Sequence, residues 1–476
     1  MTITAATVQG GQTTVSEEAL DELRARLRGP VLAPSEPGFG AVREVYNAMH
    51  PGRPALVVSC SGTADVIDAV TFARQNGLVV AVRGGGHSIA GLSAPDGSLL
   101  LDLSPMHAVQ VDADARLAHV QGGAVWGDVD RETQAFGLAT PGGVVSDTGV
   151  AGLTLGGGYG WLRRKHGLSC DNLVAADVVG ADGQVRVASD ESNPDLFWAL
   201  RGGGGNFGVV TSFTFRLSEV GPTVAFAATF YPVEEAGHVM RGWRDYLAGA
   251  PDEVTSVCLS ITFPAVPELP PAVHDRACLV VGALYTGDPD EGMRILDPVR
   301  HLGTPLFDMS QPMPFTAVQQ GFDALFPRNQ LHAYWKSRYL PSLPDDAIDF
   351  IAGKAAARPS PMTLVNTFHM GGAIAATARE DTAFAERSAP FILSIDGNWT
   401  DPGDSEANIA WVRQTFEESR QFGTDSVYLN FTGLADEATS ANLDTAFGRN
   451  LRRLARIKAK YDPANVFRAN NNITPA

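Results

Sequence analysis

Three glycine-rich segments in the first half of the chain limit the folds that it can adopt. The first, Gly84–Gly86, follows the apolar strand pattern Val79–Val82 and is followed at once by a single histidine, His87. The second runs from Gly142 to Gly160, and the third from Arg201 to Gly208. Because glycine allows positive φ and close approach of the backbone, successive amides in such turns bind anions such as a pyrophosphate. Three such loops in one region predict a long anionic ligand.

The chain has 476 residues and a formal net charge of −17. Its length suits two or three domains. We expect no binding to nucleic acid, since that requires a basic patch and the sequence has no dense Lys/Arg run. We also expect no membrane contact and a cytoplasmic location, because no uncharged apolar stretch reaches membrane-spanning length and no basic start precedes an apolar segment. The sequence carries no signal for the oligomeric state.

The cysteines and histidines give no sign of a metal site. Four cysteines are scattered without Cys-x-x-Cys spacing, so that neither zinc binding nor a disulfide framework is indicated. The histidines show no spacing typical of metal ligands. We therefore predict that the protein binds no metal.

Short strand patterns alternate with helical patterns from about residue 54 to 217. An example is the helical pattern 63–74, which precedes the strand pattern Val79–Val82. Near the N-terminus, Thr14–Glu17 matches a capping box and predicts a helix with Leu20, Leu23 and Leu27 on one face, closed by Gly29-Pro30.

The middle of the chain, about 221–423, has a different texture. It carries longer strand patterns, such as 225–231 and 277–285, with proline-rich turns between them. A charged helical pattern at about 443–461 follows. We interpret the middle region as a separate substrate domain.

A dinucleotide-binding Rossmann fold is the main alternative, because Gly203–Gly208 fits the pattern G-x-G-x-x-G. That motif requires a strand before it and a helix after it. The segment that follows, Val209–Leu217, is β-branched and alternating, which predicts a strand. The NAD-binding interpretation is therefore rejected.

Four motifs together resemble those of the FAD-linked oxidoreductases in the vanillyl-alcohol oxidase superfamily, specifically the berberine-bridge-like and 6-hydroxynicotine-oxidase-like group. They are the first glycine run with His87, the run Gly142–Gly160, the segment Asn193–Gly204 and the terminal segment Lys460–Ile473, which contains Asp-Pro-x-Asn-x-Phe-Arg-x-Asn. They occur in the family's order, and the resemblance covers nearly the whole chain.

The resemblance implies an α+β fold. It predicts an FAD-binding domain of the PCMH type in residues 1–220, with its core at about 50–220. An α+β substrate domain with a large antiparallel sheet is expected in residues 221–430, and residues 431–476 are expected to return to the FAD domain.

The resemblance also implies that FAD is bound covalently through His87. Many relatives carry a second tether, a cysteine shortly before the second glycine triplet, and Val145 stands at that position. Cys170 follows the triplet and is expected to be a buried packing thiol. The chain therefore resembles the subgroup with a single histidine tether.

The residues expected at the FAD are taken from the same motifs. They are Val82, Arg83, Gly84, Gly85, Gly86, His87, Ser88, Val145, Thr148, Gly149, Gly152, Gly156, Gly158, Tyr159, Gly208, Val209, Val210, Asn470 and Asn472.

For catalysis, Tyr428 matches a Tyr-x-Asn segment that resembles the active-site strand of sugar- and alcohol-oxidising relatives. A tyrosine with an ordinary pKa is a poor base at neutral pH, so this role requires a nearby cation or donor. Lys336 and Arg338, which share one face of a strand pattern, are the candidates. The alternative is that Tyr428 is a half-buried sheet aromatic. Thr148 is expected near the flavin ring, where it would control oxygen access, or else is a turn-forming threonine.

The function that follows is an FAD-dependent oxidase. It would remove hydride from a C–OH or C–N carbon of a small-molecule substrate, of the natural-product or glycosidic kind, and pass the electrons to O2 to give H2O2. The alternative is a flavin-dependent oxygenase or oxidative cyclase of secondary metabolism that acts on a polyketide-like or aromatic intermediate. A flavin-bearing binding or storage protein without turnover is the third hypothesis.

Overall fold

The computed structural model describes residues 3–267, 269–437 and 440–476. The chain opens with a hairpin of β1 (Ile3–Ala6) and β2 (Gln12–Val15), followed by α1 (Glu17–Arg26). The N-cap of α1 is Ser16, whose hydroxyl accepts a 3.2 Å hydrogen bond from the amide of Ala19. The predicted capping box was therefore placed too early, because Thr14 is part of β2.

A four-stranded sheet carries the first glycine loop. Its order is β3-β4-β6-β5, and β4 and β5 both run parallel to β6. The helix α3 crosses over between β4 and β5, as the predicted helix-then-strand pattern requires. The elements are β3 (Val31–Leu32), β4 (Leu56–Ser59), α3 (Thr63–Gln75), β5 (Val80–Arg83) and β6 (Leu99–Asp102).

A five-stranded antiparallel sheet carries the other glycine loops, in the order β11-β10-β12-β8-β7. The strand that starts at Val209 confirms that a strand, not a helix, follows the third glycine loop. The elements are β7 (Val109–Asp112), β8 (Leu117–Gln121), β10 (Leu173–Val179), β11 (Val185–Ser189) and β12 (Val209–Arg216), with helices α4 (Trp126–Gln134), α5 (Val150–Leu155), α6 (Arg163–His166) and α7 (Pro194–Leu200).

The middle of the chain forms a large antiparallel sheet in the order β17-β14-β16-β15-β20-β21-β19, with β18 beside β14. Its strands are β14 (Thr223–Pro232), β15 (Val254–Thr262), β16 (Ala277–Tyr285), β17 (Phe307–Asp308), β18 (Gln311–Pro314), β19 (His332–Leu340), β20 (Leu364–His369) and β21 (Phe391–Trp399). The two strand patterns predicted in this region lie in β14 and β16, which are neighbours in the sheet.

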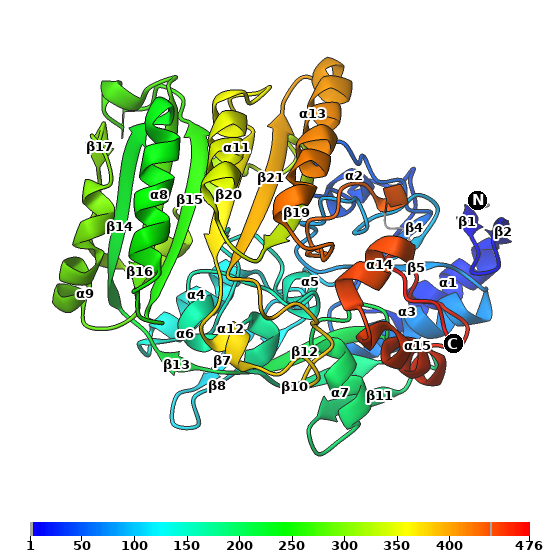
Figure 1. The fold of residues 1–476 in the computed structure, drawn as a ribbon. Helices are drawn as coiled ribbons and strands as arrows, with labels where there is room; N and C mark the ends of the chain where they lie inside the picture. Colours follow the sequence, from blue (N-terminus) through cyan, green and yellow to red (C-terminus); the bar gives the residue numbers. More distant parts are fainter. Residues whose placement is uncertain (1–2, 268, 438–439) are drawn as a thin grey trace.

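Three helices cover one face of this sheet: α8 (Ala236–Leu247), α11 (Asp345–Ala356) and α13 (Ser405–Glu418) (Figure 1). Their apolar side chains, among them Trp243, Ile348 and Val412, pack against residues of one parity on the strands. Residues of the other parity, such as Val257 and Phe368, face the glycine loops and belong to a second buried cluster. Because successive strand residues point to opposite faces, the sheet both closes a core and forms one wall of a site.

The predicted helix at 443–461 is two helices, α14 (Ser440–Phe447) and α15 (Asn450–Tyr461). The break lies at Gly448, whose φ is +50°. In α15, Lys458 is fully buried and donates 2.7 Å hydrogen bonds to Asp462 Oδ2 and to the carbonyl of Asn206. These bonds fix the C-terminal segment to the third glycine loop, and both termini lie on the same side of the molecule (Figure 1).

Within the described residues, no helix is both long and apolar enough to cross a bilayer. The same residues contain no cluster of His, Cys, Asp or Glu that is arranged to hold a metal ion. All four cysteines are free and buried.

Candidate active site

The glycine loops and the large sheet enclose a cavity of about 320 Å³. Its floor comes from the loops after β5, before α5 and before β12, and its roof from β15, β19, β20 and β21. The terminal segment contributes Asn470 and Asn471 to the lining. The cavity therefore joins a backbone-lined part to a part lined by side chains.

The first two glycine loops pack backbone to backbone. A Cβ atom on Gly85 would lie 2.3 Å from the amide nitrogen of Gly149, and one on Gly149 would lie 2.3 Å from that of Gly85. Larger residues are therefore excluded at both positions. By contrast, Cβ atoms on Gly152 and Gly205 would meet no atom of the described residues within 4 Å, and both glycines line the cavity. These two positions are open to a ligand, not to a neighbouring part of the chain.

The polar end of the cavity has acceptors without partners. Asn470 Nδ2 donates to the carbonyl of Gly205, yet the Oδ1 atoms of Asn470 and Asn471 are buried without a hydrogen bond in the described chain. A buried polar atom without a partner is costly, which indicates that a ligand completes these bonds. A long molecule with a polar tail and a flat ring, as FAD is, fits a cavity of this form.

Most of the residues predicted to contact FAD line the cavity: Val82, Gly84, Gly85, Gly86, His87, Ser88, Val145, Thr148, Gly149, Gly152, Gly156, Tyr159, Gly208, Val209, Val210 and Asn470. Three predicted residues do not. Arg83 turns away and pairs with Asp102 at 3.0 Å, Gly158 contributes only an amide to Tyr428, and Asn472 lies outside the lining. For Arg83, the alternation along β5 explains the error, since its side chain points away from the loop's ligand face.

The imidazole of His87 is largely covered and lies beside two neighbours, Tyr46 and Asp147. Its ring stacks on Tyr46 with 4.0 Å between the centroids and 16° between the planes. Its Nε2 lies 3.3 Å from Asp147 Oδ1. Val145 lines the same cavity, whereas Cys170 is buried outside it, where burial raises the pKa of its thiol.

Tyr428 lines the cavity. The sequence predicted that it lies on a strand, but in the structure it lies in a loop after α13. Its phenol oxygen accepts hydrogen bonds from Asn430 Nδ2 at 2.8 Å and from the amide of Gly158 at 3.2 Å. Burial nevertheless raises the pKa of Tyr428 well above its ordinary value, despite these two donors. Tyr428 is therefore a protonated phenol at neutral pH.

The predicted cationic neighbours of Tyr428 are on the wrong face of the sheet. Lys336 and Arg338 do share one face of β19, but it is the face covered by α13. Lys336 Nζ pairs with Glu437 at 2.7 Å, and Arg338 donates to Ser419 Oγ at 2.9 Å. Neither residue lines the cavity. Lys336, which the sequence predicted to be catalytic, therefore lies away from the cavity, because the register of β19 turns Trp335 inward instead.

The residues missed by the sequence analysis are Asp396 on β21 and Asn366 on β20. Both are buried and line the cavity. Asp396 accepts hydrogen bonds from Ser394 Oγ and from Asn366 Nδ2, the latter at 2.6 Å. Burial raises the pKa of Asp396 to about 7, although both hydrogen bonds oppose the shift. A lone carboxylate within the apolar run Phe391–Trp399 was the available signal, because a buried charge requires a specific reason.

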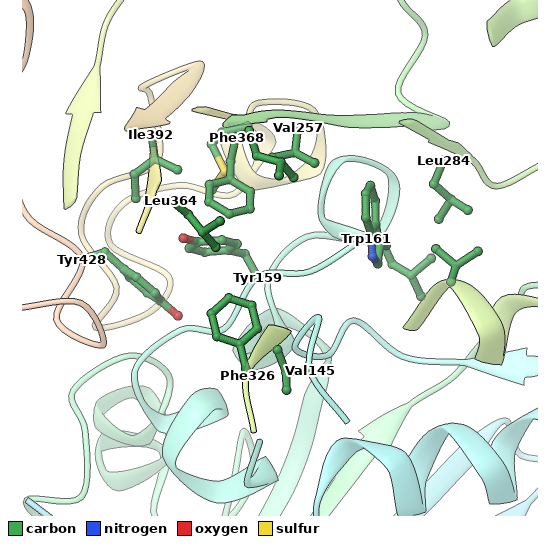
Figure 2. Close-up of a cluster of buried hydrophobic side chains, with 14 of the residues drawn as sticks. Val145, Tyr159, Trp161, Val257, Leu284, Phe326, Leu364, Phe368, Ile392 and Tyr428 are labelled. Atoms are coloured by element: carbon green, nitrogen blue, oxygen red, sulfur yellow. The ribbon is translucent and has the colours of Figure 1, made fainter. Parts of the chain in front are cut away.

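Aromatic and aliphatic side chains line the same cavity, among them Tyr159, Leu364 and Phe368 (Figure 2). The ring of Tyr159 lies 4.9 Å from that of Tyr428 and 5.3 Å from that of Phe368 between centroids. Leu364 and Phe326 flank the same space (Figure 2). A flat, mostly apolar group fits here, with Asp396, Asn366 and Tyr428 as its polar neighbours.

The three glycine loops form a backbone cradle for a long anionic ligand, and this cradle adjoins an apolar pocket that contains the buried carboxyl group of Asp396. This arrangement indicates a flavin-dependent oxidoreductase. Two family models agree: residues 54–189 match the FAD binding domain, and residues 427–474 match the family described as berberine and berberine like. The chain is 31% identical over 458 residues to an uncharacterised FAD-linked oxidoreductase of Bacillus subtilis, with 95% of this chain and 98% of that protein covered. The protein therefore belongs to the FAD-linked oxidoreductases of the berberine-like group.

Relatives whose names give a substrate match at similar identity. The (R)-6-hydroxynicotine oxidase of Paenarthrobacter nicotinovorans is 29% identical, over 94% of this chain and 97% of that protein. The crystal structure of 6-hydroxy-D-nicotine oxidase from Arthrobacter nicotinovorans superposes with a TM-score of 0.82 at 27% identity, covering 94% of this chain and 98% of the other. These matches establish the α+β flavoprotein fold and the oxidoreductase class.

Proposed function

We propose that this protein is a covalently flavinylated oxidase of a mostly apolar, ring-containing alcohol or amine. It removes hydride from a C–OH or C–N carbon, and O2 takes up the electrons to give H2O2. The observation that carries the proposal is the buried carboxyl group of Asp396 within an aromatic wall, next to the glycine cradle. Bound FAD would supply the hydride acceptor, and the residues around it supply orientation and proton transfer.

Asp396 is suited to accept the proton of the substrate hydroxyl or ammonium group. A general base works best when its pKa is near the working pH, and burial brings the pKa of Asp396 to about 7. Asn366 holds one carboxylate oxygen in place through its amide, at 2.6 Å. Its own Oδ1 is buried without a partner among the described residues and is available to a substrate donor.

Tyr428 is suited to donate a hydrogen bond to the substrate oxygen or nitrogen. Its hydroxyl accepts two hydrogen bonds, so its single proton is free to point into the cavity. The raised pKa of Tyr428 favours this donor role over that of a base. Thr148 lines the cavity beside the second glycine loop, and we retain it as the residue that controls access of O2 to the ring.

The lining favours a substrate with few polar groups over an oligosaccharide. Among the described lining residues there is no Lys or Arg, and the part under the sheet is formed largely by Val, Leu, Phe, Trp and Tyr side chains. A sugar chain would bury hydroxyl groups without partners, at a cost of about 1–3 kcal/mol each. A neutral or cationic ring compound with one hydroxyl or amino group avoids this cost.

The proposal can be tested by mixing the purified protein with candidate substrates under anaerobic conditions and recording the flavin absorbance. We expect benzylic or cyclic secondary alcohols and cyclic amines to bleach the flavin absorbance, and air to restore it with one H2O2 per product. Bleaching by oligosaccharides alone would contradict the assigned substrate class. Incorporation of labelled oxygen from O2 into the product, without H2O2, would favour the oxygenase instead.

A further inference from the structure

Asp147 and Arg328 form a charged pair next to His87, the proposed tether residue, and neither side chain lines the cavity. Asp147 lies in the loop before α5, two residues after Val145. Its Oδ1 lies 3.3 Å from His87 Nε2, and its Oδ2 accepts a 3.2 Å hydrogen bond from Arg328 Nε. The three side chains form a chain of contacts from the substrate domain to the imidazole.

Arg328 also holds the loop that carries His87. Its Nη2 donates to the carbonyl of Gly85 at 2.6 Å and to the carbonyl of Asp147 at 3.3 Å. The next residue, Asn329, donates its amide to the carbonyl of Tyr46 at 2.8 Å. Because Tyr46 stacks on the imidazole, one short segment before β19 fixes the glycine loop, the carboxylate and the ring plane together.

The contact with Asp147 favours one tautomer of His87. Burial would raise the pKa of Asp147, but His87 and Arg328 hold it below its usual value, so the group is a carboxylate at neutral pH. The 3.3 Å contact is not a hydrogen bond within the described residues, but a carboxylate repels the lone pair of a ring nitrogen and attracts an N–H group, so it favours the imidazole proton on Nε2. The lone pair is then on Nδ1.

We propose that Asp147, held by Arg328, is the positioning residue for covalent flavin attachment at His87. This inference rests on the proposed function, of which the covalent tether is a part. Asp147 does not contact substrate in this assignment. It orients the imidazole and stabilises the positive charge that develops on it.

The attachment step is balanced with O2 as the oxidant. His87 Nδ1 forms a bond to the 8α carbon of the flavin, while a C–H bond of that methyl group breaks and releases a proton. The electron pair of that C–H bond reduces the isoalloxazine ring. The alkylated imidazole loses its Nε2 proton through Asp147, and O2 reoxidises the ring, taking up two electrons and both protons as H2O2.

Four purified proteins test the proposal: wild type, Asp147→Asn, Asp147→Glu and Arg328→Gln. Each is incubated with FAD in air, and covalent flavin is measured over time as in-gel fluorescence after acid denaturation. We expect attachment to be at least tenfold slower in Asp147→Asn and slowed in Arg328→Gln. Asp147→Glu should recover most of the rate, which a purely structural role would not predict. Non-covalent FAD content and thermal midpoints show that the variants are folded and loaded.

The linkage position gives a second, independent readout. The flavinyl peptide of the wild type should carry its bond at Nδ1, as determined by NMR of the isolated aminoacyl flavin. If the wild type carries covalent flavin but Asp147→Asn attaches it equally fast, this inference is overturned while the proposed function stands. A bond at Nε2 has the same consequence. Flavin that is released from the wild type by acid would overturn the covalent tether and this inference together.

Discussion

Asn366 Nδ2 donates a 2.6 Å hydrogen bond to Asp396 Oδ2 across two neighbouring strands of the large sheet. The register of β20 and β21 pairs Asn366 with Ser394, so that Asp396 lies two residues further along on the same face. Ser394 donates to the other carboxylate oxygen. Three polar side chains thus form one network in an otherwise apolar wall.

The first prediction concerns this carboxyl group. Asp396→Asn should lower kcat by about 10²- to 10⁴-fold, the usual contribution of a general base. In the wild type, kcat/KM should rise with pH through about 7, because the pKa of Asp396 is raised to about 7 and the group is protonated, hence inactive as a base, below that pH. The variant should lack this limb while keeping its flavin. A pH profile shared by both proteins would contradict the assignment.

The second prediction concerns the cradle. Gly152→Ala should fold normally, because a Cβ there meets no atom of the described chain within 4 Å, but it should incorporate several-fold less FAD since the methyl group enters the cavity. Gly353→Ala in α11 is a matched control, a helical glycine with equally open space outside the cavity. It should stabilise the protein by roughly 0.5–1 kcal/mol without affecting FAD. Flavin content per chain, measured by absorbance, separates the two outcomes.

The third prediction follows from the position of Lys336. Lys336→Met should change kcat less than twofold, because the side chain lies under α13 and away from the cavity. It should destabilise the protein by about 1–3 kcal/mol, since it breaks a largely buried pair with Glu437. Glu437→Gln should cause a similar loss in thermal melting. A large loss of kcat at full flavin loading would restore the catalytic role first assigned to Lys336.

The fourth prediction concerns the buried pair that holds the C-terminal segment. Lys458→Met leaves Asp462 without its cation, and both side chains are 0% exposed. We expect a loss of about 3–5 kcal/mol and a lower thermal midpoint. Lys460→Met is the control, because its pair with Asp195 is exposed and worth about 1 kcal/mol or less. Equal midpoints for the two variants would contradict the structural role of Lys458.

Contacts between distant segments explain why some features of the site differ from those predicted from the sequence. Lys336 and Arg338 were correctly assigned to one face of a strand, but local alternation cannot tell which face a covering helix will take. Tyr428 was recognised by its motif, yet its pKa depends on burial and on donors from Gly158 and Asn430. The helix predicted at 443–461 passed over Gly448, where a positive φ ends α14.

The sequence by itself determined the cofactor cradle and the class of fold. The glycine runs before and after His87 act through their own backbone, so their role can be predicted from their spacing and from the absence of side chains in the sequence. The strand after Gly208 was equally readable from its β-branched alternation. Only the tertiary structure decided the chemistry of the pocket. Asp396 and Asn366 meet through the register of β20 and β21, and Arg328 reaches Asp147 from 181 residues away in sequence. Burial and pairing of this kind arise when elements pack together, and they, not residue type, set the charge state of each group.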